Sequence, residues 1–395
     1  MTPPPIRVAH VITELNMGGA EQMLFKLVTR MDRERFRCIV VSMTDKGPIG
    51  EKIAKAGVPV FRLAMGRGKP TPKGLSTFYH LLRQESVDIV QSWLYHADLF
   101  GLLVGRVAEV GRVVWGIRCS DMHLRKYRPL TALVVRLCGV LSPLADAIVV
   151  NSREGARIHR KRGYRTDRMV LIPNGFDTTV FKPDPQARGR LLNELGLADE
   201  VALIGLIARF DLMKDHPNFL RAAAILAEEE PAAHFVIVGR GITFENPGLA
   251  SHVPEGLEGR LHMLGQRDDV AGIAAALDIS TSSSAFGEGF SNTIGEAMAC
   301  GVPCVVTDVG DSAFIVGDAG VVVPAGDSEA LAAGWRRVLE LGKEERAAMG
   351  AKARERIQEE FELSVVVGRF ERLYEKLMPR NASSFELREG SDHAG

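Results

Sequence analysis

The sequence has little cysteine, few aromatic residues and no net charge, and these shortages exclude several classes of protein. Five cysteines, an odd number scattered over 395 residues, argue against a disulfide framework and favour reduced thiols in a cytosolic protein. Cys300 and Cys304 have a C-x3-C spacing, but no nearby Cys or His pair completes a zinc set. Aromatic residues make up 6% and do not interleave with the basic runs, so nucleic acid is not an expected partner.

The chain also lacks a long hydrophobic run. The most apolar window, Thr131 to Val150, contains Arg136, Pro143 and Asp146 and falls short of a membrane span. The N-terminal residues MTPPPIRVAHVI lack the charged and apolar regions of a signal peptide, so we expect a cytoplasmic protein. With 46% hydrophobic and 25% charged residues, a chain of this length suits two globular domains.

Three ligand-binding motifs are missing as well. Without a G-x-G-x-x-G loop a dinucleotide-dependent dehydrogenase is disfavoured, and without GK[ST] there is no P-loop. There is no Asp-x-Asp motif either, so we expect chemistry that needs no metal and no other cofactor.

The net charge of zero conceals an asymmetry between the two halves. Residues 1–184 contain 29 Lys and Arg against 16 Asp and Glu, a balance of +13, so the remainder (20 against 33) carries −13. The basic residues concentrate in 118–128 and 153–168, and the first run leads into the apolar segment TALVVRLCGVL. An anionic bilayer or a lipid-diphosphate acceptor fits this pairing. A solvated basic face beside a buried helix fits it too, and so does a soluble anionic acceptor.

Strand-like and helix-like segments alternate along the whole chain, as is typical of α/β proteins with parallel sheets. The alternation restarts at Val201, after the polar connector Lys182-Pro183-Asp184-Pro185. We therefore predict two doubly wound Rossmann-like domains, over residues 1–184 and 185–362, whose strand ends face each other across a cleft. An amphipathic helix follows within 363–379, and residues 380–395 have the composition of a disordered tail.

Two carboxylates lie eight residues apart around a predicted turn, within Ser282–Gly301. Glu288 lies in a Gly-rich loop, and Glu296 lies about one turn inside a helix that we expect to begin near Ser291 or Asn292. The N-terminus of that helix would present the unpaired amides of residues 292–294 to a phosphate or diphosphate. Carboxylates beside such an anion-binding site are good acceptors for hydroxyl donors. Because a sugar nucleotide carries both a diphosphate and sugar hydroxyls, the pattern predicts a sugar nucleotide as ligand. The alternative is a strand–loop–helix unit with solvent-exposed glutamates.

The sequence around these glutamates, EGFSNTIGEAMACGVPCVVTD, resembles the donor-site signature of the retaining GT-B glycosyltransferases of the family 4 type. The resemblance extends from Gly18 to about Tyr374 and is more specific in the C-terminal half. It implies a GT-B fold with an acceptor-side first domain, a nucleotide-sugar second domain and a C-terminal helix that braces the first domain. It also implies that Glu296 binds the ribose hydroxyls, and that Glu288 binds the sugar and stabilises an oxocarbenium-like state.

The loop Gly18-Gly19-Ala20-Glu21 follows the first predicted strand and opens the first helix, where adjacent glycines allow close approach to a ligand. The resemblance puts this loop near the donor diphosphate, although a simple tight turn is the alternative. Gln22 stands where many relatives have a basic residue.

Arg209 and Lys214 follow the predicted strand Val201–Ile207, a position suited to neutralising a departing diphosphate. A pair of surface cations is the alternative. Asp215 stands where relatives often have glycine, and we expect this to matter little because the backbone there need not be unusual.

His96 lies between a strand and a helix expected to start near Asp98, which we predict to cap that helix. A lone histidine is more often structural, but the resemblance implies contact with the donor sugar. Arg118 and Asn174 are candidates for the acceptor or a phosphate, and Asp177 is interpreted as a turn residue. The candidates for donor binding are Gly18, Gly19, Arg240, Arg267, Asp268, Phe290, Ser291, Asn292, Thr293 and Glu296. Backbone atoms near Arg240 and Arg267 would meet the nucleobase.

We therefore predict a metal-independent retaining enzyme with His96, Arg209, Lys214 and Glu288 as its catalytic residues. It would move a hexose or N-acetylhexosamine from a nucleotide diphosphate sugar, expected to be UDP-linked, to a lipid-linked or polysaccharide acceptor. We expect it in the cytoplasm, where its basic half could rest on the inner face of the membrane. A sugar-nucleotide epimerase of the same fold and a non-catalytic nucleotide-sugar or nucleic-acid binding module are the alternatives.

Overall fold

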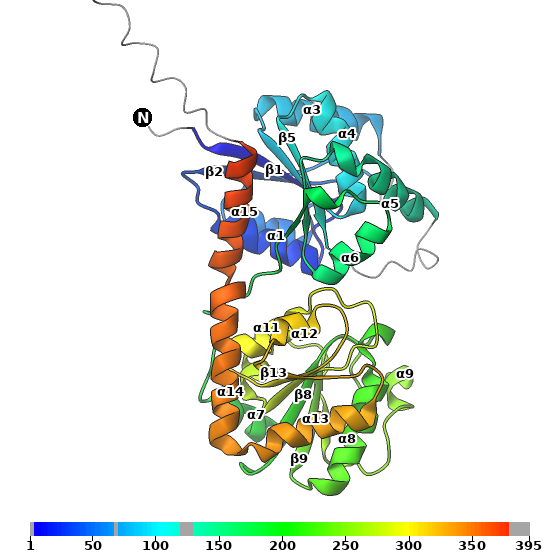
Figure 1. Ribbon diagram of the computed structural model, residues 1–395, viewed down its shortest axis with the longest axis vertical. Coiled ribbons are helices and arrows are strands. Elements are labelled where there is room, and N and C mark those ends of the chain that lie inside the picture. Colours follow the sequence, from blue (N-terminus) through cyan, green and yellow to red (C-terminus); the bar gives the residue numbers. More distant parts are fainter. Residues whose placement is uncertain (1–3, 67–69, 119–128, 379–395) are drawn as a thin grey trace, which may run out of the picture.

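A computed structural model describes residues 4–66, 70–118 and 129–378, and these form two parallel β-sheets, one above the other in Figure 1. The basic sequence around Arg125, Lys126 and Arg128, together with the tail 380–395, lies outside the described residues. The strands of the first sheet read β3-β2-β1-β4-β5-β6-β7 across the sheet. Their bounds are β1 Ile6–Ile12, β2 Phe36–Ser42, β3 Val60–Arg62, β4 Ile89–Trp93, β5 Arg112–Ile117, β6 Ala147–Val150 and β7 Met169–Leu171.

The second sheet has the order β10-β9-β8-β11-β12-β13, again entirely parallel. Its strands are β8 Ala202–Ile207, β9 Ala233–Val238, β10 Leu261–Met263, β11 Ile279–Ser282, β12 Cys304–Thr307 and β13 Gly320–Val323. Helices cover both faces of each sheet, so the central strands are buried on both sides and consist largely of Val and Ile. The predicted fold class, two doubly wound Rossmann-like domains, is confirmed.

The helices of the first domain are α1 Gly19–Arg30, α2 Gly47–Lys55, α3 Pro72–Gln84, α4 Tyr95–Val107, α5 Pro129–Leu141 and α6 Arg153–Lys161. Those that follow are α7 Ala187–Leu195, α8 His216–Glu229, α9 Pro247–Ala250, α10 Val270–Ala276, α11 Asn292–Ala299, α12 Ser312–Val316, α13 Ser328–Glu340, α14 Gly342–Arg356 and α15 Leu363–Leu377. The sequence did not predict α7, α9, α12 or α14. Two of these are very short, and α14 (GKEERAAMGAKARER) carries too few large apolar residues for a clear amphipathic period.

The chain returns from the second domain to the first through a π-helical turn, Ile357–Phe361, that leads into α15 (Figure 1). The apolar face of α15, including Val366, Phe370 and Tyr374, is buried in the core of the first domain. At the crossing, the amide of Phe176 donates to the carbonyl of Phe361 (2.9 Å), and the amide of Leu363 donates to the carbonyl of Phe176 (2.8 Å). Both chain crossings between the domains are therefore hydrogen-bonded to each other.

The helix expected to start near Asp98 begins earlier, at Tyr95, because Leu94 adopts a left-handed conformation (φ 73°) that turns the chain directly after β4. Asp98 is consequently not a cap, and that prediction is wrong. Its carboxylate is fully buried and accepts hydrogen bonds from Ser92 Oγ (2.5 Å) and the Gly116 amide (3.2 Å). These hydrogen bonds link α4 to β4 and β5 inside the domain. Burial raises the pKa of Asp98 to about 7.

Truncation of the α15 anchor tests its contribution to stability. Phe370 is fully buried and stacks on Trp93 with ring centroids 6.3 Å apart, so Phe370→Ala should lower the free energy of unfolding by about 3–5 kcal/mol. Arg372→Ala, on the exposed face of the same helix, should change it by less than about 0.5 kcal/mol. Denaturant titration measures both, and a loss below about 1 kcal/mol for Phe370→Ala would show that α15 is not an anchor.

Candidate functional site

A cavity of about 640 Å³ opens between the two domains at the N-terminus of α11. The first domain contributes the start of α1 and the ends of β4, β5 and β6, and the second contributes the segments after β8 and before α11. The predicted site residues that line it are Gly19, Arg118, Asn174, Arg209, Lys214, Glu288, Phe290, Ser291, Asn292 and Thr293. Strand ends of two parallel sheets therefore meet at one cavity, as the topology requires.

The N-terminus of α11 lies at the cavity, where the sequence predicts an anion-binding site (the anion seat). Ser291 has extended backbone angles before Asn292, and its side chain makes no capping hydrogen bond to the helix. The helix is held by close packing from behind, since a Cβ on Gly295 would overlap the ring of the buried Phe176. The amides of the first turn and the positive end of the helix dipole therefore face the cavity.

Glu288 is fixed at the edge of this cavity by two partners. Lys214 Nζ donates to Glu288 Oε2 in a short ion pair, and Ser284 Oγ donates to the same oxygen at 3.0 Å. Both side chains of the ion pair are mostly buried, with 16% (Lys214) and 11% (Glu288) of their surface exposed. A cation and a carboxylate are thus held together beside the anion seat, where a ligand with both phosphate and hydroxyl groups could engage both.

Local hydrogen bonds and an ion pair fix the segment after β8 that carries the two cations Arg209 and Lys214. Arg209 is exposed and forms an ion pair with Asp211 (2.9 Å), whose other oxygen caps the turn Leu212–Lys214. Asp215 has φ 47° and ψ 53°, a left-handed conformation, and its carboxylate caps α8 through the amide of Asn218 (3.1 Å). The expectation that the backbone there need not be unusual is therefore wrong. Aspartate replaces glycine because it tolerates this conformation and supplies a cap.

Arg118 and Asn174 connect the first domain to the anion seat. Arg118 Nη1 donates to Asn174 Oδ1 (2.9 Å), and Asn174 Nδ2 donates to Asn292 Oδ1 (2.9 Å) on α11. The guanidinium lies over the ring of Trp93 at 4.5 Å, and its buried Nε has no hydrogen-bond partner among the described residues. Burial lowers the pKa of Arg118 to about 10, so it remains a cation at neutral pH.

The start of α1 approaches the same helix from the other side. Gly19 lines the cavity, and a Cβ there would lie 3.8 Å from Asn292 Nδ2. Gly18 is the N-cap of α1 and does not line the cavity, but a Cβ on it would overlap the carboxylate of Glu21. Burial raises the pKa of Glu21, which does line the cavity and which the sequence did not single out. Leu94 and Asn151, at the ends of β4 and β6, are further lining residues that their strand-end positions could have indicated.

Glu296 lies one turn beyond the anion seat and is not among the residues that line the cavity. It is half-buried, and burial raises its pKa to about 7, an effect that the nearby positive charge of Lys26 on α1 opposes. Lys26 itself donates to the carbonyl of Gly175 (3.3 Å), and burial lowers its pKa. Asp177, interpreted as a turn residue, accepts from Thr179 and also forms an ion pair with Arg30 of α1.

The remaining candidates lie outside the cavity lining. His96 is half-buried in the first turn of α4, and burial lowers its pKa. Arg267 forms ion pairs with Glu194 (2.5 Å) and Asp269 (2.7 Å), which raise its pKa. Arg240 and Asp268 are exposed; the carbonyl of Arg240 accepts from the Phe210 amide (2.9 Å).

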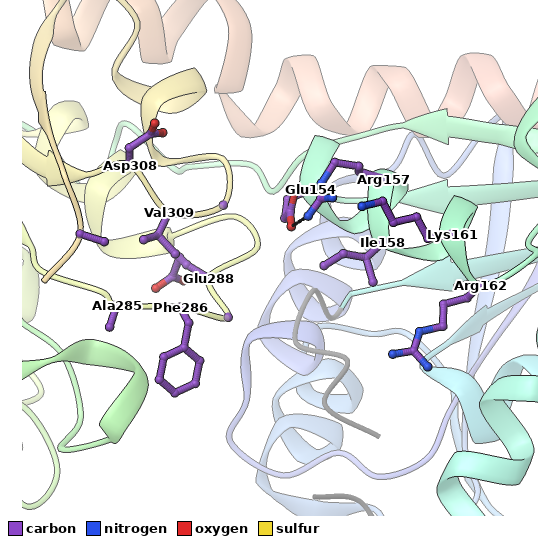
Figure 2. A pocket seen from close by; sticks show the side chains of 13 residues that line it. Glu154, Arg157, Ile158, Lys161, Arg162, Ala285, Phe286, Glu288, Asp308 and Val309 are labelled. Carbon is purple, nitrogen blue, oxygen red and sulfur yellow. Dashed lines mark hydrogen bonds and ion pairs between the residues drawn. The ribbon is translucent and has the colours of Figure 1, made fainter. Parts of the chain in front are cut away.

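A second cavity of about 740 Å³ adjoins the first and shares Gly287 and Glu288 with it. Figure 2 shows Arg157, Lys161 and Arg162 of the first domain on one side, opposite Glu288 and Asp308 of the second. Arg157 is paired with Glu154 (2.5 Å and 2.6 Å). Glu288 therefore stands at the junction of two interdomain cavities, an arrangement suited to a reaction between two ligands.

Within residues 4–66, 70–118 and 129–378, no group of three or more His, Cys, Asp or Glu side chains could hold a metal ion. In the same ranges, no helix combines the length and apolarity needed to cross a bilayer.

Comparisons with known proteins show the family of the chain. Residues 17–180 match the family model described as Glycosyltransferase Family 4, and residues 202–341 match Glycosyl transferases group 1. The N-acetyl-alpha-D-glucosaminyl L-malate synthase of Bacillus anthracis is 30% identical over 76% of this chain and 77% of its own length. The UDP-Gal:alpha-D-GlcNAc-diphosphoundecaprenol alpha-1,3-galactosyltransferase of Escherichia coli is 24% identical over 79% of this chain and 81% of its own.

Among solved structures, HepE of Anabaena in complex with UDP superimposes with a TM-score of 0.80, at 22% identity over 94% of this chain and 100% of its own. That similarity establishes the fold alone. Because the family models cover both domains, and a relative at 30% identity aligns over three quarters of each chain, the protein belongs to the group 1, family 4 glycosyltransferases of the GT-B fold.

Proposed function

We propose that the protein is a retaining glycosyltransferase that moves a hexose or N-acetylhexosamine from a UDP-sugar to a lipid-linked or polysaccharide acceptor without a metal ion. The observation that carries this proposal is the Lys214–Glu288 pair at the junction of the two interdomain cavities, directly beside the amides of α11. One cavity would hold the donor and the other the acceptor, with the reacting sugar at Glu288. The named substrates of the E. coli relative, a UDP-sugar and a lipid diphosphate, support this choice.

The donor diphosphate would be bound by groups that the chain already gathers. The amides at the start of α11 and the side chains of Arg209 and Lys214 supply positive charge without a metal ion. Arg118, held against Trp93 and linked to Asn292 through Asn174, adds a cation from the first domain. Glu296 lies about 6 Å along the helix axis from Asn292, at ~1.5 Å rise per residue, and would accept the ribose hydroxyls.

Transfer would then need little rearrangement of the site. The bond from the anomeric carbon to the diphosphate oxygen breaks, and its electron pair stays on the departing UDP, where the amides and the two cations stabilise it. The acceptor hydroxyl forms the new bond on the same face of the sugar, and its proton passes to the departing phosphate oxygen. Glu288 would hold a sugar hydroxyl and stabilise the positive charge that develops on the ring, and His96 would contact the sugar from the first domain.

Removing the cation tests this mechanism. Lys214→Ala should lower kcat at least about 100-fold, because a preorganised charge is lost where the leaving group develops its own. Transfer from UDP-glucose, UDP-galactose, UDP-N-acetylglucosamine and GDP-mannose would be measured with EDTA present, and we expect one UDP-sugar to be used. Lys352→Ala, which breaks the exposed ion pair with Asp318 outside both cavities, is the matched control and should retain activity.

Three results would contradict the proposal: Lys214→Ala activity within about threefold of wild type, a strict requirement for Mg²⁺, or inversion at the anomeric carbon. Epimerisation of the sugar nucleotide without any acceptor would instead indicate the epimerase alternative.

The raised pKa of Glu296 predicts a pH dependence of donor binding. With a pKa of about 7, the carboxylate is ionised above neutral pH and can accept both ribose hydroxyls, whereas below pH 7 it gains a proton. The Kd of the intact UDP-sugar should therefore rise by up to about tenfold per pH unit as the pH falls from 7 to 5.5. Calorimetric titration of wild type and Glu296→Gln would check this, since the neutral variant should bind weakly at every pH. If the Kd of Glu296→Gln rose on acidification as steeply as that of wild type, this role of Glu296 would be excluded.

A further inference from the structure

One face of α5 carries a row of exposed apolar side chains. Val134, Val135 and Cys138 of this helix are buried against the first domain, as expected for a packed helix. The opposite face exposes Leu130, Leu133, Leu137 and Val140, with exposed fractions from 40% (Leu137) to 76% (Val140). Because the intervals are three or four residues, these side chains form one continuous stripe.

The stripe continues beyond α5. Leu144, three residues past the end of the helix, is 53% exposed, and Arg106 of α4 donates to its carbonyl (2.6 Å). Leu103 and Val107, which flank Arg106 on α4, are exposed as well. We call this seven-residue surface the apolar face; its members are Leu103, Val107, Leu130, Leu133, Leu137, Val140 and Leu144. Single exposed leucines are ordinary, but a contiguous set over two helices is a marker of an interaction site.

Cations lie near the apolar face, on α5 itself and at the contact between α5 and α6. Arg136 is exposed within the stripe itself, and Arg160, Lys161 and Arg162 are exposed at the C-terminal end of α6. The two helices touch there, since a Cβ on Gly139 of α5 would lie 2.8 Å from the carbonyl oxygen of Arg162. Figure 1 shows α5 and α6 together on the side of the first domain away from α15.

The same cations lead into the site. Lys161 and Arg162 line the second cavity, and Glu288 lines it from the opposite side (Figure 2). The apolar face, the cations near it and the cavity that we assign to the acceptor are therefore consecutive along one side of the molecule.

We infer that the apolar face docks the protein on an anionic bilayer, so that a lipid-linked acceptor enters the second cavity past Lys161 and Arg162; the acceptor part of this inference rests on the proposed function. At 13 residues, α5 is too short to span a bilayer and would lie in its surface, with leucines among the acyl chains and arginine at the headgroups. The cations also argue against a second copy of this chain as the occupant. A two-fold dimer through this face would set two surfaces that both carry Arg136 and neighbouring cations against each other.

Vesicle binding by the full-length protein tests the inference. We would measure co-sedimentation with phosphatidylcholine vesicles that contain 30% phosphatidylglycerol, and with pure phosphatidylcholine vesicles as the uncharged comparison. The double variant Leu133→Gln/Leu137→Gln should bind the anionic vesicles at least about tenfold more weakly than wild type. The matched control, Leu75→Gln/Val322→Gln, removes two exposed apolar side chains outside the apolar face and should bind as wild type does. Lys161→Gln and raised salt should weaken binding to anionic vesicles only.

Several outcomes would overturn the inference. These are vesicle binding unchanged in Leu133→Gln/Leu137→Gln, absence of vesicle binding by wild type, and a wild-type dimer in light scattering that this variant converts to a monomer. Thermal unfolding checks that the variant is folded. Its binding of the UDP-sugar in free solution should equal that of wild type, which separates a failure of docking from a failure of the proposed transferase function.

Discussion

Burial of α15 in the first domain is the constraint on which the rest of the structure depends. The chain leaves the first domain once, builds the second, and then commits the apolar face of a 15-residue helix to the core that it left. Phe370 of that helix packs on Trp93, and Trp93 in turn supports the guanidinium of Arg118. The hydrogen-bonded chain from Arg118 through Asn174 to Asn292 on α11 therefore depends on the packing of a helix that does not itself line the cavity.

Two cations of the site each have a carboxylate partner before any ligand arrives. Lys214 is paired with Glu288, and Arg209 with Asp211, so the empty site avoids isolated buried charge. An incoming diphosphate would compete with these carboxylates for the same cations. Once the phosphates bind the two cations, Glu288 and Asp211 lose their ion-pair partners but stay beside the cavity. Their oxygens would then be free to accept hydrogen bonds from hydroxyl groups of the ligand.

Periodicity and turn chemistry predicted the fold and much of the cavity, and the failures have physical causes. The strand ends and the start of α11 at Asn292 followed from local sequence, because short apolar runs and a Gly-rich loop act locally. The side-chain cap expected at the start of α11 does not form, since Ser291 makes no capping hydrogen bond. The start of α4 at Tyr95 could not be predicted, because it follows a leucine with positive φ, a backbone conformation that is rare for leucine. The same holds for Asp215. The partners of Arg267 and the position of Glu296 behind the cavity depend on neighbours distant in sequence, which one sequence does not reveal.

The hydrogen-bonded pairing of the two crossings, at Phe176 and at Phe361–Leu363, bears on how the domains can move. Two interdomain segments that lay far apart would resist bending in most directions. Two segments that are hydrogen-bonded to each other, as these are, would act as a single hinge. The ring of Phe176 is packed against Gly295 in the second domain, so this joint begins on the first-domain side, near Asn174. Any opening of the domains would then be a rotation about this joint, close to Asn174. The hydrogen bond that links that residue to Asn292 lies almost on the pivot, where a given angle of opening displaces atoms least.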